Sequence, residues 1–348
     1  MNPFISVRTL TDGGQTPLEV AHLIATFIDG SARTLDLAQY DFELGPESAR
    51  VVGGAIRRAH DRGVRVRLAI NVDHRNPIPV PPPSSPDLDL IRSLPVEAFP
   101  VAGVPDLMHH KYVVRDEQAV WTGSTNWTDD SWSRQENVIV IVDSAGVAGQ
   151  YAANFAEFAE GTPVAASGAT AGPPIDGIRT WFTPRGGPDL SHRIAQAIGL
   201  AQRRVRVCSP VISTGPILGA LAGVVASGRV DVAGCIDAVQ LQGVAVQWRG
   251  GASAWKLPLL ARLTGGQFTA KQSNPYARSR LHDSMHAKVV VADDTVFVGS
   301  FNLSRSGESN AENVLEFEDA EIAEQLARFV DTVRARYDVL TLPAADAG

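Results

Sequence analysis

The strongest constraint on the fold of this chain is an internal repeat. The stretch "LMHHKYVVRDEQAVWTGSTNW" begins at Leu107, and "SMHAKVVVADDTVFVGSFNL" begins at Ser284. Both contain His-x-Lys, four further residues, Asp, and then Gly-Ser-x-Asn, at a spacing of 177 residues that becomes 176 after one deletion. A repeat of this kind predicts that the chain folds as two similar halves.

The likeness between the halves extends beyond these motifs and indicates the fold class. "ENVIVIVD" (136–143) matches "ENVLEFED" (312–319), and a segment with helical spacing of apolar residues follows each. Upstream, "AIRRAHDRGVRVRLAINVD" and "ALAGVVASGRVDVAGCID" both read helix, turn, strand. This alternation predicts an α/β fold with two similar lobes, each with a mixed or largely parallel sheet covered by helices.

Length and composition suggest where the halves are joined. A chain of 348 residues exceeds the usual size of a single core, so two domains are expected. The segment "EGTPVAASGATAGPPIDG" (160–177) is rich in Ala, Gly and Pro and has no apolar periodicity, which is typical of a linker. We therefore predict one domain at 1–160, a linker at 161–177 and a second domain at 178–348.

The overall composition excludes several classes of protein. With 44% apolar and 20% charged residues and a net charge of −7, the chain is typical of globular proteins and not of a broadly basic nucleic-acid coat, although a local basic cleft remains open. The two cysteines, Cys208 and Cys235, give no disulfide framework and are expected as buried free thiols. Because neither a signal peptide nor a membrane-spanning apolar run is visible, we expect a cytoplasmic location.

The repeated motif places a specific set of side chains together. Side chains alternate along a strand, so His109 and Lys111 share one face and His110 takes the other. His110 is therefore expected to be packed or hydrogen-bonded. Two duplicated halves usually pack about a pseudo-two-fold axis, which brings both His-x-Lys motifs, including His286 and Lys288, to one cleft.

This set of side chains suits an anionic tetrahedral group. The two lysines supply positive charge, and neutral donors for phosphate oxygens are available from Ser124, Asn126, Ser300 and Asn302. One imidazole can attack phosphorus while the other protonates the leaving oxygen. Performing both roles with the same residue type requires environments that separate their protonation states.

Four acidic residues also recur in phase with the motif. Glu136 and Glu312 are each expected to bond the far ring nitrogen of a motif histidine and so fix its tautomer. Asp116 and Asp293 begin the turn after the motif strand, where a structural Asx-type turn is favoured over a catalytic role. A metal site is disfavoured, since His-x-Lys lacks a second ligand at zinc spacing and the ammonium groups would repel a cation. We expect no metal and no cofactor.

The doubled H-x-K-x4-D motif followed by G-S-x-N resembles the hallmark of the phospholipase D superfamily. "RTLDLAQYDFE", "RGVRVRLAIN" and "WFTPRGG" are also similar to segments found around these motifs, so the resemblance covers nearly the whole chain. It implies a bilobal α-β-α sandwich with one active site between the lobes, and a phosphohistidine mechanism without metal. By this resemblance His109 is the nucleophile and His286 is the general acid that later activates water. Phosphate binding falls to Lys111, Lys288, Asn126 and Asn302. Because the internal duplication already supplies both motifs, a monomer is expected to suffice for catalysis.

The substrate is less constrained than the chemistry. Residues 241–290 contain the single acid Asp283 and seven basic residues, which either steer a polyanion or are scattered surface charge (Arg249, Lys256, Arg262, Lys271, Arg278, Arg280, Lys288). We expect Trp127 in the core, and Trp132 with Arg278 and Arg280 at the substrate rim.

Three functions remain open on the sequence alone. The favoured one is hydrolysis of a phospholipid phosphodiester, with transphosphatidylation as a variant, since Asp129 and Asp130 would repel a polyanion and suit a cationic headgroup. The first alternative is a metal-independent endonuclease acting on DNA or RNA, whose binding would depend steeply on salt. The second is a non-catalytic phosphate-binding module.

Overall fold

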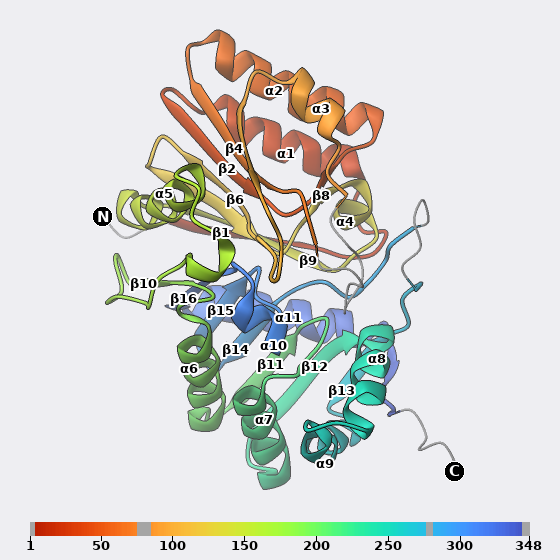
Figure 1. Cartoon of the computed structure of the whole chain (residues 1–348). Coiled ribbons are helices and arrows are strands. Elements are labelled where there is room, and N and C mark those ends of the chain that lie inside the picture. The colour runs from red at the N-terminus through yellow and green to blue at the C-terminus, as the bar shows by residue number, and fades with distance from the viewer. Residues whose placement is uncertain (1–3, 75–84, 276–280, 343–348) are drawn as a thin grey trace.

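The structure, a computed structural model, describes residues 4–74, 85–275 and 281–342, and it contains two large sheets, one above the other in Figure 1. We call each sheet, with the helices that cover it, a lobe. The first lobe contains β1 (Phe4–Leu10), α1 (Pro17–Asp29), β2 (Thr34–Gln39), β3 (Phe42–Glu43), α2 (Pro46–Asp61), β4 (Arg65–Asn71), α3 (Leu88–Ser93), β5 (Glu97–Val101), β6 (Lys111–Arg115), β7 (Ala119–Gly123), β8 (Trp127–Thr128), α4 (Asp129–Ser133), β9 (Asn137–Asp143) and α5 (Ala145–Ala159).

The second lobe repeats this order with additions. It contains β10 (Ile178–Phe182), α6 (Gly187–Leu200), β11 (Arg204–Cys208), α7 (Gly215–Ser227), β12 (Asp231–Asp237), α8 (Ala238–Arg249), α9 (Leu257–Ala261), β13 (Phe268–Lys271), β14 (Val289–Ala292), β15 (Thr295–Gly299), α10 (Arg305–Ser309), β16 (Asn313–Glu318), α11 (Ala320–Arg334) and β17 (Asp338–Val339). Short 3₁₀ helices lie at Val164–Ala166, Ala254–Lys256 and Arg262–Thr264.

The two sheets correspond strand for strand. The first has the order β1-β9-β7-β6-β2-β4-β5, and the second has β10-β16-β15-β14-β11-β12-β13-β17, so β17 is an added edge strand. In each sheet the strands at one side are parallel (β2-β4-β5 and β11-β12-β13), whereas the remaining pairs are antiparallel. The expectation of two duplicated α/β lobes with mixed sheets is confirmed.

Helices cover both faces of each sheet, and the inner faces share one core. Buried apolar residues of α1 and α2 pack on the outer face of the first sheet, and those of α6 and α7 pack on the outer face of the second. The inner faces, together with α5 and α11, enclose a third cluster of buried residues that runs through both lobes. Because burial of apolar surface is the main force that holds elements together, this shared cluster fixes one lobe against the other.

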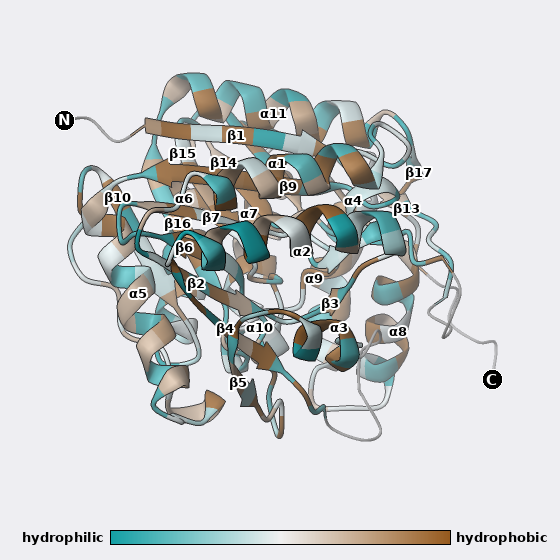
Figure 2. Cartoon of the chain, turned by 90° about the horizontal axis from the view of Figure 1, so that it is seen from above, coloured by the Kyte–Doolittle hydropathy of each residue, from teal (hydrophilic) through white to brown (hydrophobic). Residues whose placement is uncertain are grey.

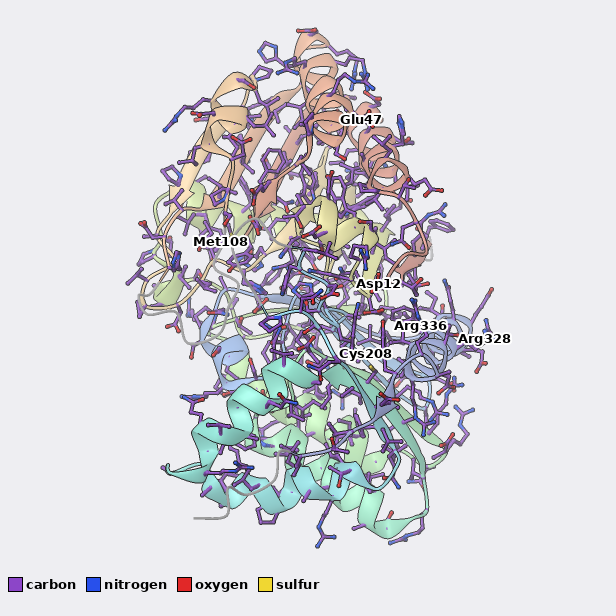
Figure 3. The ribbon with its side chains drawn as sticks, turned by 90° about the vertical axis from the view of Figure 1, so that its right-hand side faces the viewer. Asp12, Glu47, Met108, Cys208, Arg328 and Arg336 are labelled. Carbon is purple, nitrogen blue, oxygen red and sulfur yellow. The ribbon has the colours of Figure 1, made fainter. Side chains whose placement is uncertain are left out.

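Contacts between the lobes also involve the ends of the chain. Helix α11 of the second lobe lies beside β1 of the first (Figure 2), and Gln325 Nε2 donates to the Val7 carbonyl oxygen at 3.1 Å. Met108, the residue before the first motif histidine, is buried where the lobes meet (Figure 3). The first motif therefore begins at the boundary between the lobes.

Two smaller expectations can be compared with the structure. Cys208 and Cys235 are buried, free and opposite one another on β11 and β12, as predicted. None of the helices in the described ranges is long and apolar enough to cross a membrane. The cytoplasmic location and the boundaries at 160 and 178 remain predictions.

Candidate active site

Backbone hydrogen bonds between the lobes place both motif histidines. The His109 N–H donates to the Ala311 carbonyl oxygen at 2.9 Å, and the His286 N–H donates to the Glu136 carbonyl oxygen at 3.1 Å. Each histidine thus lies against the segment that leads into the strand next to the edge strand of the opposite lobe, β16 for His109 and β9 for His286. The duplication brings the two motifs into one place, as the sequence predicted.

A cavity of about 500 Å³ lies at this place, and the motif residues form part of its wall. His109 and Asn126 from the first lobe line it together with His286 and Asn302 from the second. Its volume is within the range of pockets that enclose small-molecule ligands. The four residues are therefore available to a single bound group.

His109 is oriented by a carboxylate of the opposite lobe. Its Nδ1 lies 2.8 Å from Glu312 Oε2, and both side chains are buried. A carboxylate accepts the proton at Nδ1, so this contact assigns the lone pair to Nε2. The edge-on ring of Tyr40, with ring centroids 4.5 Å apart, packs against the imidazole.

The charges around His109 favour a neutral imidazole. Burial, together with Lys111 and Lys288, lowers the pKa of His109 well below its usual value. Burial raises the pKa of Glu312 to about 8, whereas charged Lys111 and Lys288 lower it, so the carboxylate form of Glu312 is favoured when both lysines carry their charge, as they would beside a bound anion. A neutral imidazole with a free Nε2 is the form that can act as a nucleophile.

His286 has a different partner. Its Nδ1 lies 3.2 Å from Asn137 Oδ1, and the Asn137 amide nitrogen donates to the Ser131 carbonyl oxygen at 2.9 Å, which directs the amide oxygen to the ring. Burial, together with Lys288 and Lys111, also lowers the pKa of His286. The two motif histidines therefore occupy environments that differ in the charge of the group on Nδ1.

The two motif lysines are buried beside the histidines. Lys111 Nζ donates to the His109 carbonyl oxygen at 2.8 Å, and Lys288 Nζ donates to the His286 carbonyl oxygen at 2.5 Å. Burial lowers the pKa of Lys111 to about 7, with Glu312 and Asp41 opposing the change, and burial together with Lys111 lowers the pKa of Lys288. An anion bound between them would restore the charged forms.

The two motif asparagines complete the polar wall. The side-chain oxygens of Asn126 and Asn302 are buried and have no hydrogen-bond partner among the residues that the structure describes. Both line the cavity, so their amides are available to a ligand. Lys111 and Lys288 are not among the lining residues, so the amides could contact a bound phosphate directly, and the lysines, buried beside the lining histidines, would add positive charge.

Ser124 and Ser300 are not among the residues that line the cavity, and their hydroxyls bond neighbouring strands, so phosphate binding by these serines stays a prediction that this geometry does not support. Ser124 Oγ donates to Asn137 Oδ1 at 2.6 Å, and Ser300 Oγ accepts from the Asn313 N–H at 3.0 Å. The preceding glycine explains this geometry, because a Cβ on Gly123 would lie 2.1 Å from the Val138 carbonyl oxygen. The glycine lets neighbouring strands approach, and each serine bonds the adjacent strand.

Asp116 and Asp293 lie at the turns after the motif strands. Asp116 accepts from the backbone N–H groups of Ala32, Arg33 and Thr34. Asp293 accepts from those of Gln202, Arg203 and Arg204. Both aspartates have positive φ, 56° and 55°, which Asp tolerates better than most residues. The structural interpretation fits both positions.

Glu136 departs from the expectation. Its Oε2 lies 3.0 Å from Lys271 Nζ, and its Oε1 accepts from the Tyr337 hydroxyl and, at 3.4 Å, from the Asp12 N–H. The prediction that it fixes the tautomer of a motif histidine is therefore wrong. Lys271 lies far from Glu136 in sequence, so the repeat alone could not reveal this contact.

The position of Trp132 also differs from the prediction that it lies at the substrate rim. Its side chain is 0% exposed and packs in the outer core of the first lobe with Trp127, so it does not form a substrate rim. Helix α4 has five residues, too short for apolar periodicity to show which face is buried. Arg278 and Arg280, the other expected rim residues, lie outside the described residues.

His110 has the packing role expected of it. It is buried among Tyr112, Phe158 and Phe182, and its Nδ1 lies 3.1 Å from the Asn313 amide nitrogen of the second lobe. It therefore contributes to the joint between the lobes and not to the cavity wall.

One wall of the cavity was missed by the sequence analysis. It comes from the second lobe and contains Val211, Val244, Trp248 and Lys256. Lys256 Nζ donates to the Ser213 carbonyl oxygen at 2.7 Å and lies 5.2 Å from the Trp248 ring centroid. Nothing in the local pattern of α8 distinguishes cavity-facing from buried positions.

Comparisons with solved structures agree with the bilobal fold. Phosphatidylserine synthase of Haemophilus influenzae Rd KW20 matches 96% of this chain and 87% of its own, with a TM-score of 0.65 and 13% identity. Polyphosphate kinase of Porphyromonas gingivalis matches 94% of this chain and 46% of its own, with a TM-score of 0.61 and 9% identity. At these identities the likeness concerns the fold alone.

Sequence comparisons are more specific. Mitochondrial cardiolipin hydrolase of Homo sapiens is 30% identical over 111 residues, which span 32% of this chain and 39% of that protein. The protein of the same name from Xenopus laevis is 32% identical over 126 residues, 36% of this chain and 54% of that one. The chain thus spans about half or less of the length of these curated relatives.

A family model extends the match across both halves. The model, described as the PLD-like domain of cardiolipin synthase, matches residues 24–159 and again residues 194–333. Each matched segment includes one His-x-Lys motif and the strands that carry it. The chain therefore belongs to the phospholipase D superfamily, the family that its doubled motif resembles.

Proposed function

We propose that this protein is a metal-independent phosphodiesterase that hydrolyses a phospholipid through a phosphohistidine at His109. The observation that carries the proposal is the asymmetric pair of imidazoles in one cavity. His109 has a carboxylate on Nδ1, and His286 has a neutral amide there. The pair matches the needs of a nucleophile and a general acid.

In the first step, His109 Nε2 attacks phosphorus and the bond from phosphorus to the leaving oxygen breaks. His286, in the protonated form that a bound anionic phosphodiester favours, passes its Nε2 proton to the leaving oxygen, which departs as an alcohol. Glu312 stabilises the positive charge that develops on the His109 ring. Lys111, Lys288, Asn126 and Asn302 hold the non-bridging oxygens, where charge must be balanced during the displacement.

In the second step, water attacks the phosphorus of the phosphohistidine. Neutral His286 accepts a proton from this water, and the bond from phosphorus to His109 Nε2 breaks. The enzyme returns to its starting protonation state and releases a phosphate monoester. An alcohol that takes the place of water would give transphosphatidylation by the same route. Every role is filled by a side chain, so the proposal requires no metal and a single chain suffices.

The cavity wall supports a phospholipid as substrate. Val211, Val244 and Trp248 offer an apolar surface beside the polar residues of the motifs. A lipid places an apolar chain and a phosphodiester next to each other, so its two parts match the two parts of this wall. The curated relatives to which the chain is similar are named cardiolipin hydrolases, which also favours a lipid.

A metal-independent endonuclease is the second candidate. Lys256 and Arg305 line the same cavity and provide cations beyond the two motif lysines. Further phosphates of a nucleic acid would find partners there. Arg305 is already paired with Glu308 at 2.8 Å, however, which weakens this attraction.

The proposal is tested by one assay in EDTA. Wild type, His109→Ala and the control His22→Ala, an exposed residue of α1, are given phosphatidylcholine micelles, cardiolipin micelles, single-stranded DNA and duplex DNA. We expect choline release from phosphatidylcholine, or phosphatidic acid release from cardiolipin, in wild type and control only. Cleavage of DNA that depends on His109, without lipid hydrolysis, would establish the nuclease instead. Binding without turnover of any of these substrates would favour a phosphate-binding module.

A further inference from the structure

The duplication is broken at the partners of the two imidazoles. His109 and Glu312 correspond in the repeat to His286 and Glu136. Glu312 reaches across the lobe boundary to His109 Nδ1 at 2.8 Å. Exact symmetry would bring Glu136 to His286 in the same way, but His286 Nδ1 instead lies 3.2 Å from Asn137, the residue after Glu136.

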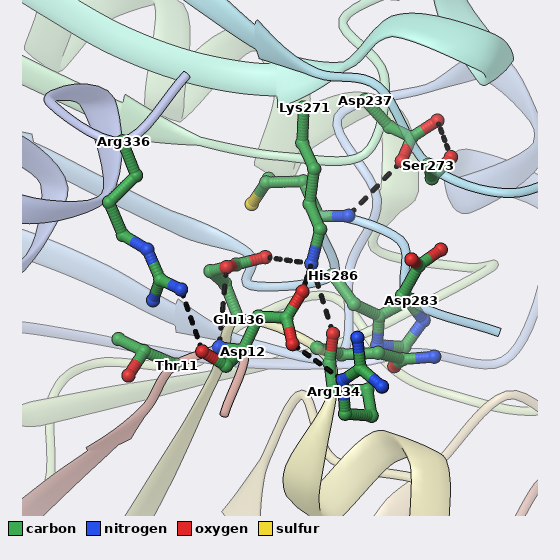
Figure 4. A network of polar contacts seen from close by, with 12 residues as sticks. Thr11, Asp12, Arg134, Glu136, Asp237, Lys271, Ser273, Asp283, His286 and Arg336 are labelled. Carbon is green, nitrogen blue, oxygen red and sulfur yellow. Dashed lines mark hydrogen bonds and ion pairs between the residues drawn. The ribbon is translucent and has the colours of Figure 1, made fainter. Parts of the chain in front are cut away.

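Glu136 is held by other groups. Lys271 Nζ lies 3.0 Å from Glu136 Oε2. The same ammonium nitrogen lies 3.1 Å from Asp12 Oδ2 and 3.0 Å from the Arg134 carbonyl oxygen. The Tyr337 hydroxyl donates to Glu136 Oε1. Figure 4 shows Lys271 between the carboxylates of Glu136 and Asp12. We call Asp12, Arg134, Lys271 and Tyr337 the Glu136 clamp.

The ion pair between Lys271 and Glu136 is buried, and the clamp joins both lobes. Glu136 is 0% exposed and Lys271 is 3% exposed, so breaking their pair would leave a charge without water. Arg134 binds Asp12 Oδ1 at 2.7 Å, and Arg336 donates to the Asp12 carbonyl oxygen at 2.7 Å (Figure 4). These contacts fix Asp12, whose carboxylate shares Lys271 with Glu136.

Lys271 occupies a position at which the residue type differs between the two lobes. The N–H of Met108 donates to Asn71 at the end of β4, and that of Met285 donates to Asp237 at the end of β12. Asn71 and Asp237 are therefore equivalent positions. On the neighbouring strands, Val101 pairs with Asn71, and Lys271 pairs with Asp237.

The first lobe thus has an apolar Val101 where the second has a cation. A valine cannot bind a carboxylate, so nothing at that position draws Glu312 away from His109. An ammonium group at the equivalent position of the second lobe binds Glu136. Lys271, together with Tyr337 and the Asp12 N–H, gives Glu136 partners other than His286.

We propose that Lys271, assisted by Tyr337, is a positioning residue that holds the Glu136 carboxylate away from His286 and so makes the two imidazoles chemically different. The proposal rests on the proposed function. With a neutral amide on Nδ1, protonated His286 is less stabilised than it would be beside a carboxylate, so it gives its proton to the leaving oxygen more readily. His109 keeps its carboxylate, which stabilises the ring when it bears phosphorus.

Other charged groups also face His286, and they must stay constant in any test. Among the described residues, the charged groups that lower the pKa of His286 are Lys288, Lys111, His109 and His282. Asp237 binds the N–H of the preceding Met285. The variants below leave all of these in place.

The test is the pH dependence of kcat/KM in EDTA for wild type, Lys271→Met, Lys271→Arg and the double variant Lys271→Met with Glu136→Gln. Lys271→Met frees Glu136 to act on His286, so we expect the fall of activity at high pH to move up by about one pH unit. Lys271→Arg keeps the ion pair and should follow wild type. The double variant removes both charges together and should also return to the wild-type profile.

Two results would overturn the proposal. In one, the fall of kcat/KM at high pH (the high-pH limb of the profile) occurs at the same pH in Lys271→Met as in wild type. In the other, the double variant is shifted as far as the single one, which would mean that loss of the Lys271 charge acts on His286 without Glu136.

Folding is controlled with a milder variant. If Lys271→Met does not fold, Tyr337→Phe removes one donor to Glu136 without changing any charge. It should shift the same limb in the same direction by a smaller amount, and an unshifted limb in a folded Tyr337→Phe counts against the clamp.

Failure of the proposed function is distinguishable from failure of the clamp. A wild-type protein that turns over none of the phosphodiesters refutes the function. The titration of His286, followed by NMR of ring-labelled histidine, tests the clamp independently of turnover. It should show a higher pKa for His286 in Lys271→Met than in wild type or the double variant, and equal values would refute the clamp.

Discussion

The two motif histidines differ in the partner of Nδ1, and this difference belongs to single residues. Glu312 contacts His109, whereas Asn137 contacts His286 and Glu136 is bound to Lys271. The repeat predicted both glutamates as partners because it shows equal spacing in both copies. It could not show Lys271, whose contact with Glu136 depends on how strands far apart in the sequence come together.

The two glutamates form a matched pair for mutation. Glu312→Gln removes the charge that stabilises the His109 ring, so we expect kcat to fall by about 10²-fold or more. Glu136→Gln leaves both imidazoles with their present partners and should cost less than about tenfold. Steady-state kinetics on the same lipid measures both, and equal losses would contradict the assigned asymmetry.

Asp116 provides a prediction about stability and pH. Burial acts to raise its pKa, but hydrogen bonds from the Thr34, Ala32 and Arg33 N–H groups outweigh burial, so its pKa lies below the usual value. A lowered folded-state pKa means that the carboxylate stabilises the fold above the unfolded value of about 3.9, and that this stability is lost as pH falls through the folded value.

Asp116→Asn should therefore lower the free energy of unfolding near neutral pH by about 1 kcal/mol, since the site is partly exposed and screened. The difference from wild type should shrink in acid, as the pH falls below the unfolded value of about 3.9 and through the folded-state pKa. Urea unfolding at the two pH values measures it, with Asp293→Asn as the matched twin. A difference that persists unchanged in acid would show that ionisation of Asp116 is not the cause.

At the scale of elements, local patterns predicted the strands and failed at the surfaces between them. Strand alternation placed His109 and Lys111 together and His110 apart, because period two is a property of the strand itself. The assignment of Trp132 failed because the burial of the five-residue α4 is decided by α1 and not by its own sequence. The cavity wall on α8 went unseen for the same reason.

That wall can be tested with two positions on one helix. Val244 lines the cavity, whereas Val246 of the same helix is 59% exposed and is not among the lining residues. Val244→Asp places a charge on the apolar wall and should raise KM for the lipid by about tenfold or more. Val246→Asp is the control. The same KM for both variants would mean that this wall does not contact substrate.

At the scale of the whole molecule, the site exists because two lobes share one core. Helices α5 and α11 and the inner faces of both sheets form a single buried cluster, which sets the motifs against each other. The repeat predicted two lobes and one shared cleft. It could not predict how closely the histidines of one lobe approach the other, because that depends on packing along the whole boundary.

The central claim is that His109 becomes covalently bound to phosphorus. His286→Ala removes the acid and the group that activates water, so an aryl phosphodiester, whose leaving group needs no proton, should react once and leave the intermediate in place. The measurement is mass spectrometry of the protein after this reaction. We predict one phosphoryl adduct on the peptide that contains His109, and none in the variant that also carries His109→Ala. An adduct on another residue, or continued turnover without one, would contradict the account.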